Sequence, residues 1–148
     1  MKIDLVTEAH LDELLPLMRG YCDFYEAEPS DADLLAMARA LIADHTLEGL
    51  QLIARDDNGT AVGFATIFWT WSTSSAARIG TMNDLYVAPD ARGGGYADAL
   101  IKECVERCRK RGAIRLEWQT ALDNHRAQKV YDRVGGTKES WFDYWLAS

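Results

Sequence analysis

A glycine-rich turn between two hydrophobic runs is the stretch of this chain whose residues are best suited to chemistry. An apolar run at residues 85–87 leads into Gly93, Gly94 and Gly95, and apolar residues then recur at helical spacing from Ala97. A strand that enters a helix through glycines exposes several backbone N–H groups at one point, and the helix dipole adds positive potential there. The turn therefore predicts a binding site for an anion such as a pyrophosphate.

Two other phosphate-binding loops fit these residues less well. A dinucleotide-binding loop has the pattern Gly-x-Gly-x-x-Gly, and counting from Gly93 this pattern meets Asp98 where the third glycine belongs. A Walker A loop ends in Gly-Lys-Ser/Thr, which the turn does not supply. A solvent-exposed glycine turn without a ligand is the remaining alternative, and a second motif downstream weighs against it.

The second motif lies on a short predicted helix that is followed by two glycines. Asn124, Ala127 and Tyr131 are spaced by three and four residues, which places them along one helix face. Taken singly, Asn124 could be only a helix N-cap and Tyr131 only a core tyrosine. In this order after a glycine loop, the three residues indicate a joint site.

Together the two motifs resemble those of the GNAT superfamily of N-acetyltransferases. Arg92, Gly95 and Ala97 fit its acyl-CoA loop, Arg/Gln-x-x-Gly-x-Gly/Ala, and residues 124–131 fit its second motif, Asn-x-x-Ala-x-x-x-Tyr. Specific residues carry the resemblance over about residues 79–145, and upstream only the order of elements does. It implies an α/β fold, the three-layer α/β/α GNAT acyl-CoA N-acyltransferase fold with a mixed, mostly antiparallel sheet.

The resemblance also implies acetyl-CoA as co-substrate and no metal. Acetyl-CoA would lie in a gap between the strand ending at Val87 and the strand starting at Ile114. Strand edges would pair with its amide-rich arm, loop N–H groups would hold its pyrophosphate, and Arg92 would add a charge-assisted donor. The implied cofactor-binding residues are Leu85, Tyr86, Val87, Arg92, Gly93, Gly94, Gly95, Tyr96, Ala97, Asn124, Ala127 and Tyr131.

The implied reaction is direct attack of a neutral amine on the thioester. Tyr131 is the expected general acid, which protonates the departing thiolate of CoA. Spermidine/spermine-type acetyltransferases carry a Glu-Asp pair where this chain has Asn83 and Asp84. Because Asn83 cannot take a proton, we expect Asp84, or a water held by Asn83, to be the base. A purely structural hydrogen-bonding role for Asp84 is the alternative.

The expected acceptor site combines aromatic rings with carboxylates, which suits an ammonium group. The Arg19-x-Tyr21-x-x-Phe24-Tyr25 pattern resembles a branch of small GNAT proteins related to yeast histone- and polyamine-acetylating enzymes. The expected acceptor is a small amine or polyamine, or else a lysine or N-terminal amine, and a solvated acidic helix end is the alternative. The expected acceptor-binding residues are Tyr21, Phe24, Tyr25, Glu28 and Trp69.

These residues need a scaffold of alternating strands and helices. The hydrophobic spacing predicts a strand at 2–6, helices at 8–26 and 31–44, strands at 51–55, 61–71 and 79–87, a helix from the glycine turn to 111, a strand at 114–119, a helix at 124–133 and a strand at 141–146. Pro16 would kink or split the first helix. Asp57, Asn58 and Gly59 predict a tight hairpin. The order is βααβββαβαβ.

Length, charge and cysteine content limit the number of domains, the binding partners and the cellular location that the sequence allows. The 148 residues predict one domain, 1–148, which the resemblance implies is an N-acetyltransferase domain. A formal charge of −7 argues against nucleic-acid binding. Three cysteines, no signal-like start and no long apolar run predict a soluble cytoplasmic protein without a membrane partner.

Aromatic residues on both faces of 141–146 suggest a homodimer interface. The alternative function is a non-catalytic acyl-CoA-binding or sensing module, which Asn83 would favour and Tyr131 would not.

Overall fold

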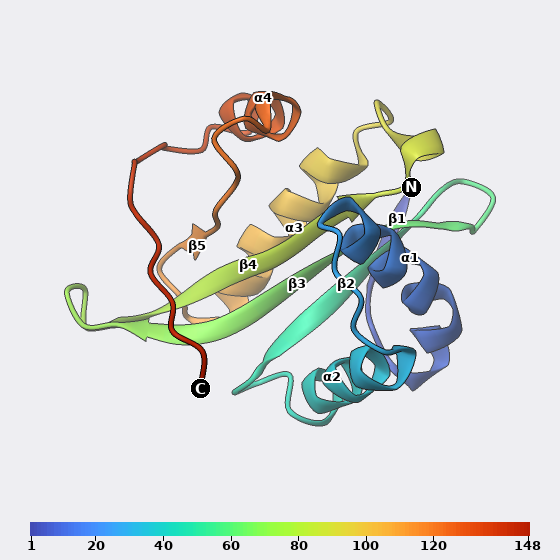
Figure 1. Cartoon of the computed structure of the whole chain (residues 1–148), viewed down its shortest axis with the longest axis horizontal. Helices are drawn as coiled ribbons and strands as arrows, with labels where there is room; N and C mark the ends of the chain where they lie inside the picture. Colours follow the sequence, from blue (N-terminus) through green and yellow to red (C-terminus); the bar gives the residue numbers. More distant parts are fainter.

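The computed structural model describes residues 1–148 and contains one five-stranded sheet with strand order β1-β2-β3-β4-β5 (Figure 1). The first three pairings are antiparallel, whereas β4 and β5 are parallel. The predicted mixed, mostly antiparallel sheet is therefore confirmed. The strands are β1 (Lys2–Leu5), β2 (Gly49–Arg55), β3 (Ala61–Ser72), β4 (Ala77–Val87) and β5 (Leu116–Glu117).

Helices cover both faces of this sheet, which confirms the predicted three layers. In Figure 1, α1 and α2 lie in front of the sheet and α3 lies behind it. Each side has its own apolar core, since Phe64 packs with α1 and α2 while Ile67 packs with α3. The helices are α1 (Leu11–Phe24), α2 (Asp31–Ala43), α3 (Tyr96–Arg111) and α4 (His125–Arg133), with single 3₁₀ turns at Glu8–His10 and Pro89–Ala91.

Local signals set most of the element ends. Ser30 Oγ accepts from the backbone N–H of Asp33 (3.1 Å) and caps α2. Gly112 ends α3 in the left-handed region, with φ 77°. The hairpin between β2 and β3 closes where predicted, with Gly59 at φ 85°. Pro16 lies inside an unbroken α1, so the chain is not split at Pro16, and a separate 3₁₀ turn, Glu8–His10, precedes the helix. None of the helices combines the length and apolar character that crossing a membrane requires.

A β-bulge in β4 opens the outer edge of the sheet. Thr66 of β3 pairs with Asp84, yet the next residue, Ile67, pairs with Met82, so Asn83 is the extra residue. A bulge bends its strand and increases the local twist. The pairing of β4 with β5 covers only two residues and stops at Thr81, just before the bulge. The end of β4 therefore has no neighbouring strand on that side.

Two predicted strands differ in the structure. The strand predicted at 114–119 is only two residues long, and Ile114 is 56% exposed rather than on a buried face. The strand predicted at 141–146 is absent, and the segment runs past β5 as an extended stretch (Figure 1). Its exposed fractions are Trp141 82%, Phe142 89%, Tyr144 93%, Trp145 84% and Leu146 96%.

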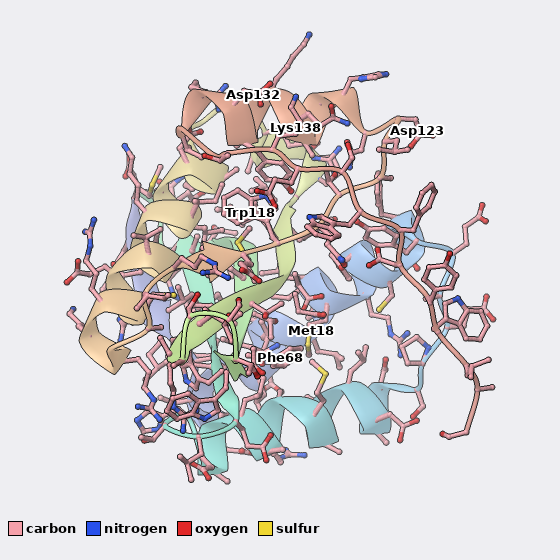
Figure 2. All side chains as sticks on the ribbon, turned by 90° about the vertical axis from the view of Figure 1, so that its left-hand side faces the viewer. Met18, Phe68, Trp118, Asp123, Asp132 and Lys138 are labelled. Carbon is pink, nitrogen blue, oxygen red and sulfur yellow. The ribbon has the colours of Figure 1, made fainter.

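These segments form little or no strand because alternating side chains only favour an extended backbone. A strand also needs a neighbouring strand edge with which its backbone can form hydrogen bonds. The tie of this segment to the end of β5 is a side-chain bond from Gln119 Nε2 to Asp143 Oδ1 (2.7 Å). Nearer to α4, Lys138 pairs with Asp132 at 3.5 Å (Figure 2). These two polar contacts leave the aromatic side chains uncovered.

Candidate active site

The glycine turn forms an open cradle at the start of α3. Gly93 and Gly95 adopt φ +87° and +80°, and a Cβ at either position would meet no atom within 4 Å. The backbone N–H groups of Gly93, Gly95, Tyr96 and Ala97 donate to no backbone or side-chain acceptor, whereas that of Gly94 donates to Ala91. Unpaired N–H groups at a helix N-terminus suit an anion. The turn therefore fits the pyrophosphate that the sequence predicts for it.

The open end of β4 continues from this cradle. The N–H of Ala88 donates to β3 at Val62, so in the alternating antiparallel pattern Leu85 and Val87 turn their backbone groups to the outer edge. The Val87 carbonyl accepts from Arg92 Nε at 3.0 Å, which ties the loop to the strand. The N–H groups of this edge and the terminal nitrogens of Arg92 remain available to a ligand.

Tyr86 differs from its predicted place among the cofactor-binding residues. Its backbone pairs with Phe64 of β3. Its ring packs on the α1 side, and the centroids of the Tyr86 and Phe64 rings are 6.2 Å apart. Its ring lies against Gly20 of α1, where a Cβ would come within 2.7 Å of the Tyr86 Cζ. Because strand residues alternate between faces, Tyr86 belongs to the core under α1 and not to the open edge.

The second motif lies on α4 as predicted. Asn124 is the N-cap of α4, and its Oδ1 accepts a hydrogen bond from the N–H of Ala127 at 3.2 Å. Its oxygen therefore has the capping role that was the alternative for this residue. Its Nδ2 donates to no protein group. Tyr131 is half-buried on the same face and packs edge-on against Trp118, with ring centroids 5.3 Å apart. Burial raises the pKa of Tyr131, and Tyr25 adds to the effect. The phenol is therefore protonated and can act as a donor.

Asp84 of β4 is buried. Burial raises the pKa of its carboxyl, and hydrogen bonding from the Thr66, Tyr21 and Asn83 side chains lowers it by a smaller amount. The Asn83 bond is from Nδ2 to Asp84 Oδ1, at 2.9 Å. No charged side chain is among these influences. A raised pKa and a set of neutral donors suit a proton acceptor held in one orientation.

Two tyrosines of α1 connect the two halves of the site. Tyr21 donates from its hydroxyl to the backbone carbonyl of Asn83 at 3.3 Å, and its pKa is raised by burial and by the nearby Asp84 charge. Its ring centroid is 4.9 Å from that of Tyr25. Tyr25 contributes to the raised pKa of both Tyr21 and Tyr131.

The remaining predicted acceptor residues divide into two groups. Phe24 packs edge-on against Tyr25 at 5.0 Å, and both rings are more than half exposed. Glu28 is exposed, without a bonded partner, in the loop that Arg19 ties down through Pro29. Trp69 lies elsewhere: it is 7% exposed in the core on the α3 side. The structure therefore brings the α1 residues together and does not bring Trp69 to them.

The sequence analysis missed two polar residues that lie in one row with Asp84 across the sheet. Gln51 and Thr66 are buried and hydrogen-bonded to each other at 3.2 Å. The signal that could have found them is a polar residue at an inward position in each of two otherwise apolar strands. Alternation predicts that such residues face the interior, where each needs a partner.

The structure contains no cluster of three or more metal-binding side chains. All three cysteines are free and buried. Burial raises the pKa of the Cys108 thiol to about 11. Thiols of this kind are poor nucleophiles and poor metal ligands.

Comparison with known proteins agrees with this geometry. Residues 13–136 match the model of the acetyltransferase (GNAT) family. An uncharacterised N-acetyltransferase of Bacillus subtilis (strain 168), YhfO, is 31% identical over 129 residues, which cover 87% of this chain and 85% of that protein. A thialysine N-epsilon-acetyltransferase of Caenorhabditis elegans is 26% identical over 147 residues, 97% of this chain and 89% of that protein.

Solved structures agree as well. The crystal structure of a probable acetyltransferase has a TM-score of 0.86 and 29% identity, and the match covers all of this chain and 97% of that one. The family match spans the glycine turn, β4 and α4, so it includes both sequence motifs. The chain therefore belongs to the GNAT family and is an acyl-CoA-dependent N-acetyltransferase.

Proposed function

We propose that this protein transfers an acetyl group from acetyl-CoA to the primary amine of a small cationic acceptor by direct attack. One observation carries the proposal. Tyr25, at the C-terminal end of α1, packs against Tyr21, whose hydroxyl donates to the Asn83 carbonyl beside the candidate base Asp84, and Tyr25 also adds to the raised pKa of the candidate acid Tyr131. This arrangement supports a single site for the acceptor region, the base and the acid. Its parts come from α1, β4 and α4.

Acetyl-CoA supplies the activated acyl group as a thioester. The unpaired N–H groups from Gly93 to Ala97 would hold the pyrophosphate, and the free edge of Leu85 and Val87 would pair with the amide-rich arm. The edge lies beside the bulge at Asn83, so binding there brings the thioester close to the α1 tyrosines. Positioning of this kind contributes much of the rate in acyl transfer.

Two side chains would move protons. Asp84, or a water held by Asn83, takes the proton of the attacking amine, and burial brings the pKa of Asp84 closer to neutral pH, where a base is more effective. Tyr131 gives its proton to the departing sulfur. Since burial keeps the Tyr131 phenol neutral, it can do so without placing a charge in the cleft.

The acceptor would bind at the end of α1. Tyr21, Phe24 and Tyr25 form a connected set of rings, and Glu28 adds an exposed carboxylate nearby in the chain. Rings and carboxylates attract an ammonium group. The acceptor is a small amine or polyamine, or a lysine or N-terminal amine. The relative named for thialysine and a yeast D-amino-acid N-acetyltransferase, 35% identical over 78 residues, support an amine of amino-acid size.

The exposed aromatic residues at 141–146 support a homodimer in which this segment is covered by a second copy. We further propose that the chain works as one N-acetyltransferase domain in the cytoplasm, a compartment that suits three free cysteines. Light scattering at micromolar concentration tests the dimer. A monomeric mass, unchanged when Phe142 and Tyr144 are both replaced by serine, would contradict it.

The function is tested by thiol release from acetyl-CoA with a panel of polyamines, amino acids, aminoglycosides and lysine peptides. Amine-dependent release should fall at least about a hundredfold in Tyr131→Phe, the range that general acid catalysis contributes. Tyr144→Phe removes a hydroxyl from an exposed tyrosine and is the matched control. Tight acetyl-CoA binding without turnover on any amine would instead support the acyl-CoA-binding module.

A further inference from the structure

The buried polar residues of this protein form one row across the sheet. Gln51 of β2, Thr66 of β3 and Asp84 of β4 expose 2%, 0% and 6% of their surface, and no other polar residue is buried to this degree. The strand register pairs Gln51 with Thr66, and Thr66 with Asp84. The row therefore lies on the face under α1 and α2, where the neighbouring core is apolar.

Hydrogen bonding gives this row a direction. Gln51 Nε2 donates to Thr66 Oγ1 at 3.2 Å and lies 3.7 Å from Met18 Sδ, a second acceptor. Because Thr66 Oγ1 accepts this bond, its one hydroxyl proton is free for the carboxylate of Asp84, which accepts but does not donate when ionised. The row therefore presents a proton donor to Asp84.

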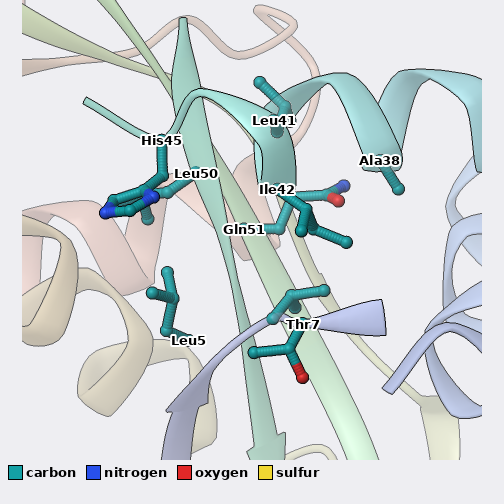
Figure 3. A pocket seen from close by; sticks show the side chains of 9 residues that line it. Leu5, Thr7, Ala38, Leu41, Ile42, His45, Leu50 and Gln51 are labelled. Atoms are coloured by element: carbon teal, nitrogen blue, oxygen red, sulfur yellow. The ribbon is translucent and has the colours of Figure 1, made fainter. Parts of the chain in front are cut away.

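Gln51 is otherwise hard to explain at this position. Its Oε1 is buried and has no hydrogen-bond partner, which carries a free-energy penalty. Figure 3 shows the side chain under α2, among residues such as Ile42 and Leu41 that line a mostly apolar cavity of about 200 Å³. A leucine would fit these surroundings without an unpaired oxygen. The bond from Nε2 to Thr66 is the feature that only the amide provides.

We propose that Gln51 and Thr66 are positioning residues for acetyl transfer, which hold the Asp84 carboxylate in one orientation and favour its ionised form. This inference rests on the proposed role of Asp84 as the base. The other groups that act on Asp84 are Tyr21 from α1 and Asn83 from its own strand, and none of them is charged. The Thr66 side chain, which the strand register places opposite Asp84, is one of three neutral groups that lower the pKa of this carboxyl against the effect of burial.

The test is a carbon-13 NMR titration of the aspartate-labelled full chain, with the Asp84 resonance assigned by its absence in Asp84→Asn. In Thr66→Val, which keeps the shape but loses the hydroxyl, the Asp84 carboxyl should titrate at higher pH than in the wild type. The acidic limb of kcat/KM should move with it, so that activity on this limb falls about tenfold per pH unit of displacement. Thr66→Ser keeps the donor and should follow the wild type.

Gln51→Leu provides a second variant that leaves the hydroxyl of Thr66 in place. It should move the titration in the same direction, because Thr66 is no longer turned toward Asp84. If Asp84 titrates as in the wild type in folded Thr66→Val or Gln51→Leu, the positioning role is wrong, even where Asp84→Asn is inactive. If Asp84→Asn keeps the wild-type kcat and pH profile, the base assignment fails as well. The two failures are thus distinguished.

Discussion

Asp98 in the first turn of α3 and Arg133 at the end of α4 form a two-pronged ion pair, with Nε–Oδ1 at 2.9 Å and Nη2–Oδ2 at 2.6 Å. The arginine fork matches the carboxylate and holds the pKa of Asp98 below its ordinary value. The pair joins the helix that begins at the glycine cradle to the helix that carries Tyr131. It therefore ties the glycine cradle, where we propose that the coenzyme binds, to the helix of the candidate acid.

Removing this pair should affect catalysis more than stability. In Arg133→Gln the last turn of α4 loses its tie to α3, and we expect kcat/KM for acetyl-CoA to fall, while unfolding changes little because the pair is largely exposed. Steady-state kinetics and thermal unfolding measure both. Arg126→Gln, on the same helix but without an ionic partner, is the control and should behave as the wild type. Equal losses in the two variants would rule out a specific role for the pair.

Alanine substitutions at Gly95 and Gly59, which both have a left-handed backbone, distinguish the effect of backbone strain from an effect on ligand binding. Both have φ near +80° and open space at the Cβ position, so alanine at either should cost about 1–2 kcal/mol of stability. Only Gly95→Ala places a methyl group in the cradle, and it alone should weaken acetyl-CoA binding, as calorimetry would measure. The cradle assignment would be wrong if Gly59→Ala, in the distant hairpin, weakened binding as much.

Asp84 should make stability depend on pH. Burial raises its pKa in the folded protein, so the fold binds the proton more tightly than the unfolded chain does. Its contribution to stability is therefore present below the ordinary carboxylate pKa of about 4 and is lost as pH rises through the raised folded value. Asp84→Asn should gain stability relative to the wild type over this window.

Thermal unfolding of both proteins from acidic to neutral pH measures this difference. Asp23→Asn, at an exposed position on α1, serves as the control for removing one carboxylate. Parallel curves for Asp84→Asn would mean that the carboxyl carries no burial penalty. The predicted gain would also show that the wild-type residue is kept at a cost to stability, as expected of a functional group.

Gly20 should be required inside α1 by the ring of Tyr86. A Cβ there would lie 2.7 Å from Tyr86 Cζ, so Gly20→Ala should lose about 1–3 kcal/mol through overpacking. The better helix propensity of alanine offsets about 1 kcal/mol of this loss. Chemical denaturation measures the net change, and adding Tyr86→Phe should recover part of it by removing the hydroxyl. A more stable Gly20→Ala protein would contradict the contact.

Much of the scaffold was predictable because its signals are local. The cap of α2 by Ser30, the hairpin at Gly59 and the end of α3 at Gly112 each depend on residues within one turn, and the predicted hairpin is confirmed. The glycine loop and the Asn124 helix were predictable as a family pattern for the same reason. Their residues are close in sequence, so spacing alone identifies them.

The amino-acid sequence by itself determined the family, the order of elements up to α4 and the residue types of the cradle. The tertiary structure decided that Trp69 is buried, that the ring of Tyr86 packs against the core under α1, that 141–146 forms no strand, and that Gln51 and Thr66 lie in line with Asp84. These outcomes depend on the register between strands and on which edges find partners. Local sequence patterns do not encode register across the sheet, because a shift at one bulge, here Asn83, changes which residues face each other.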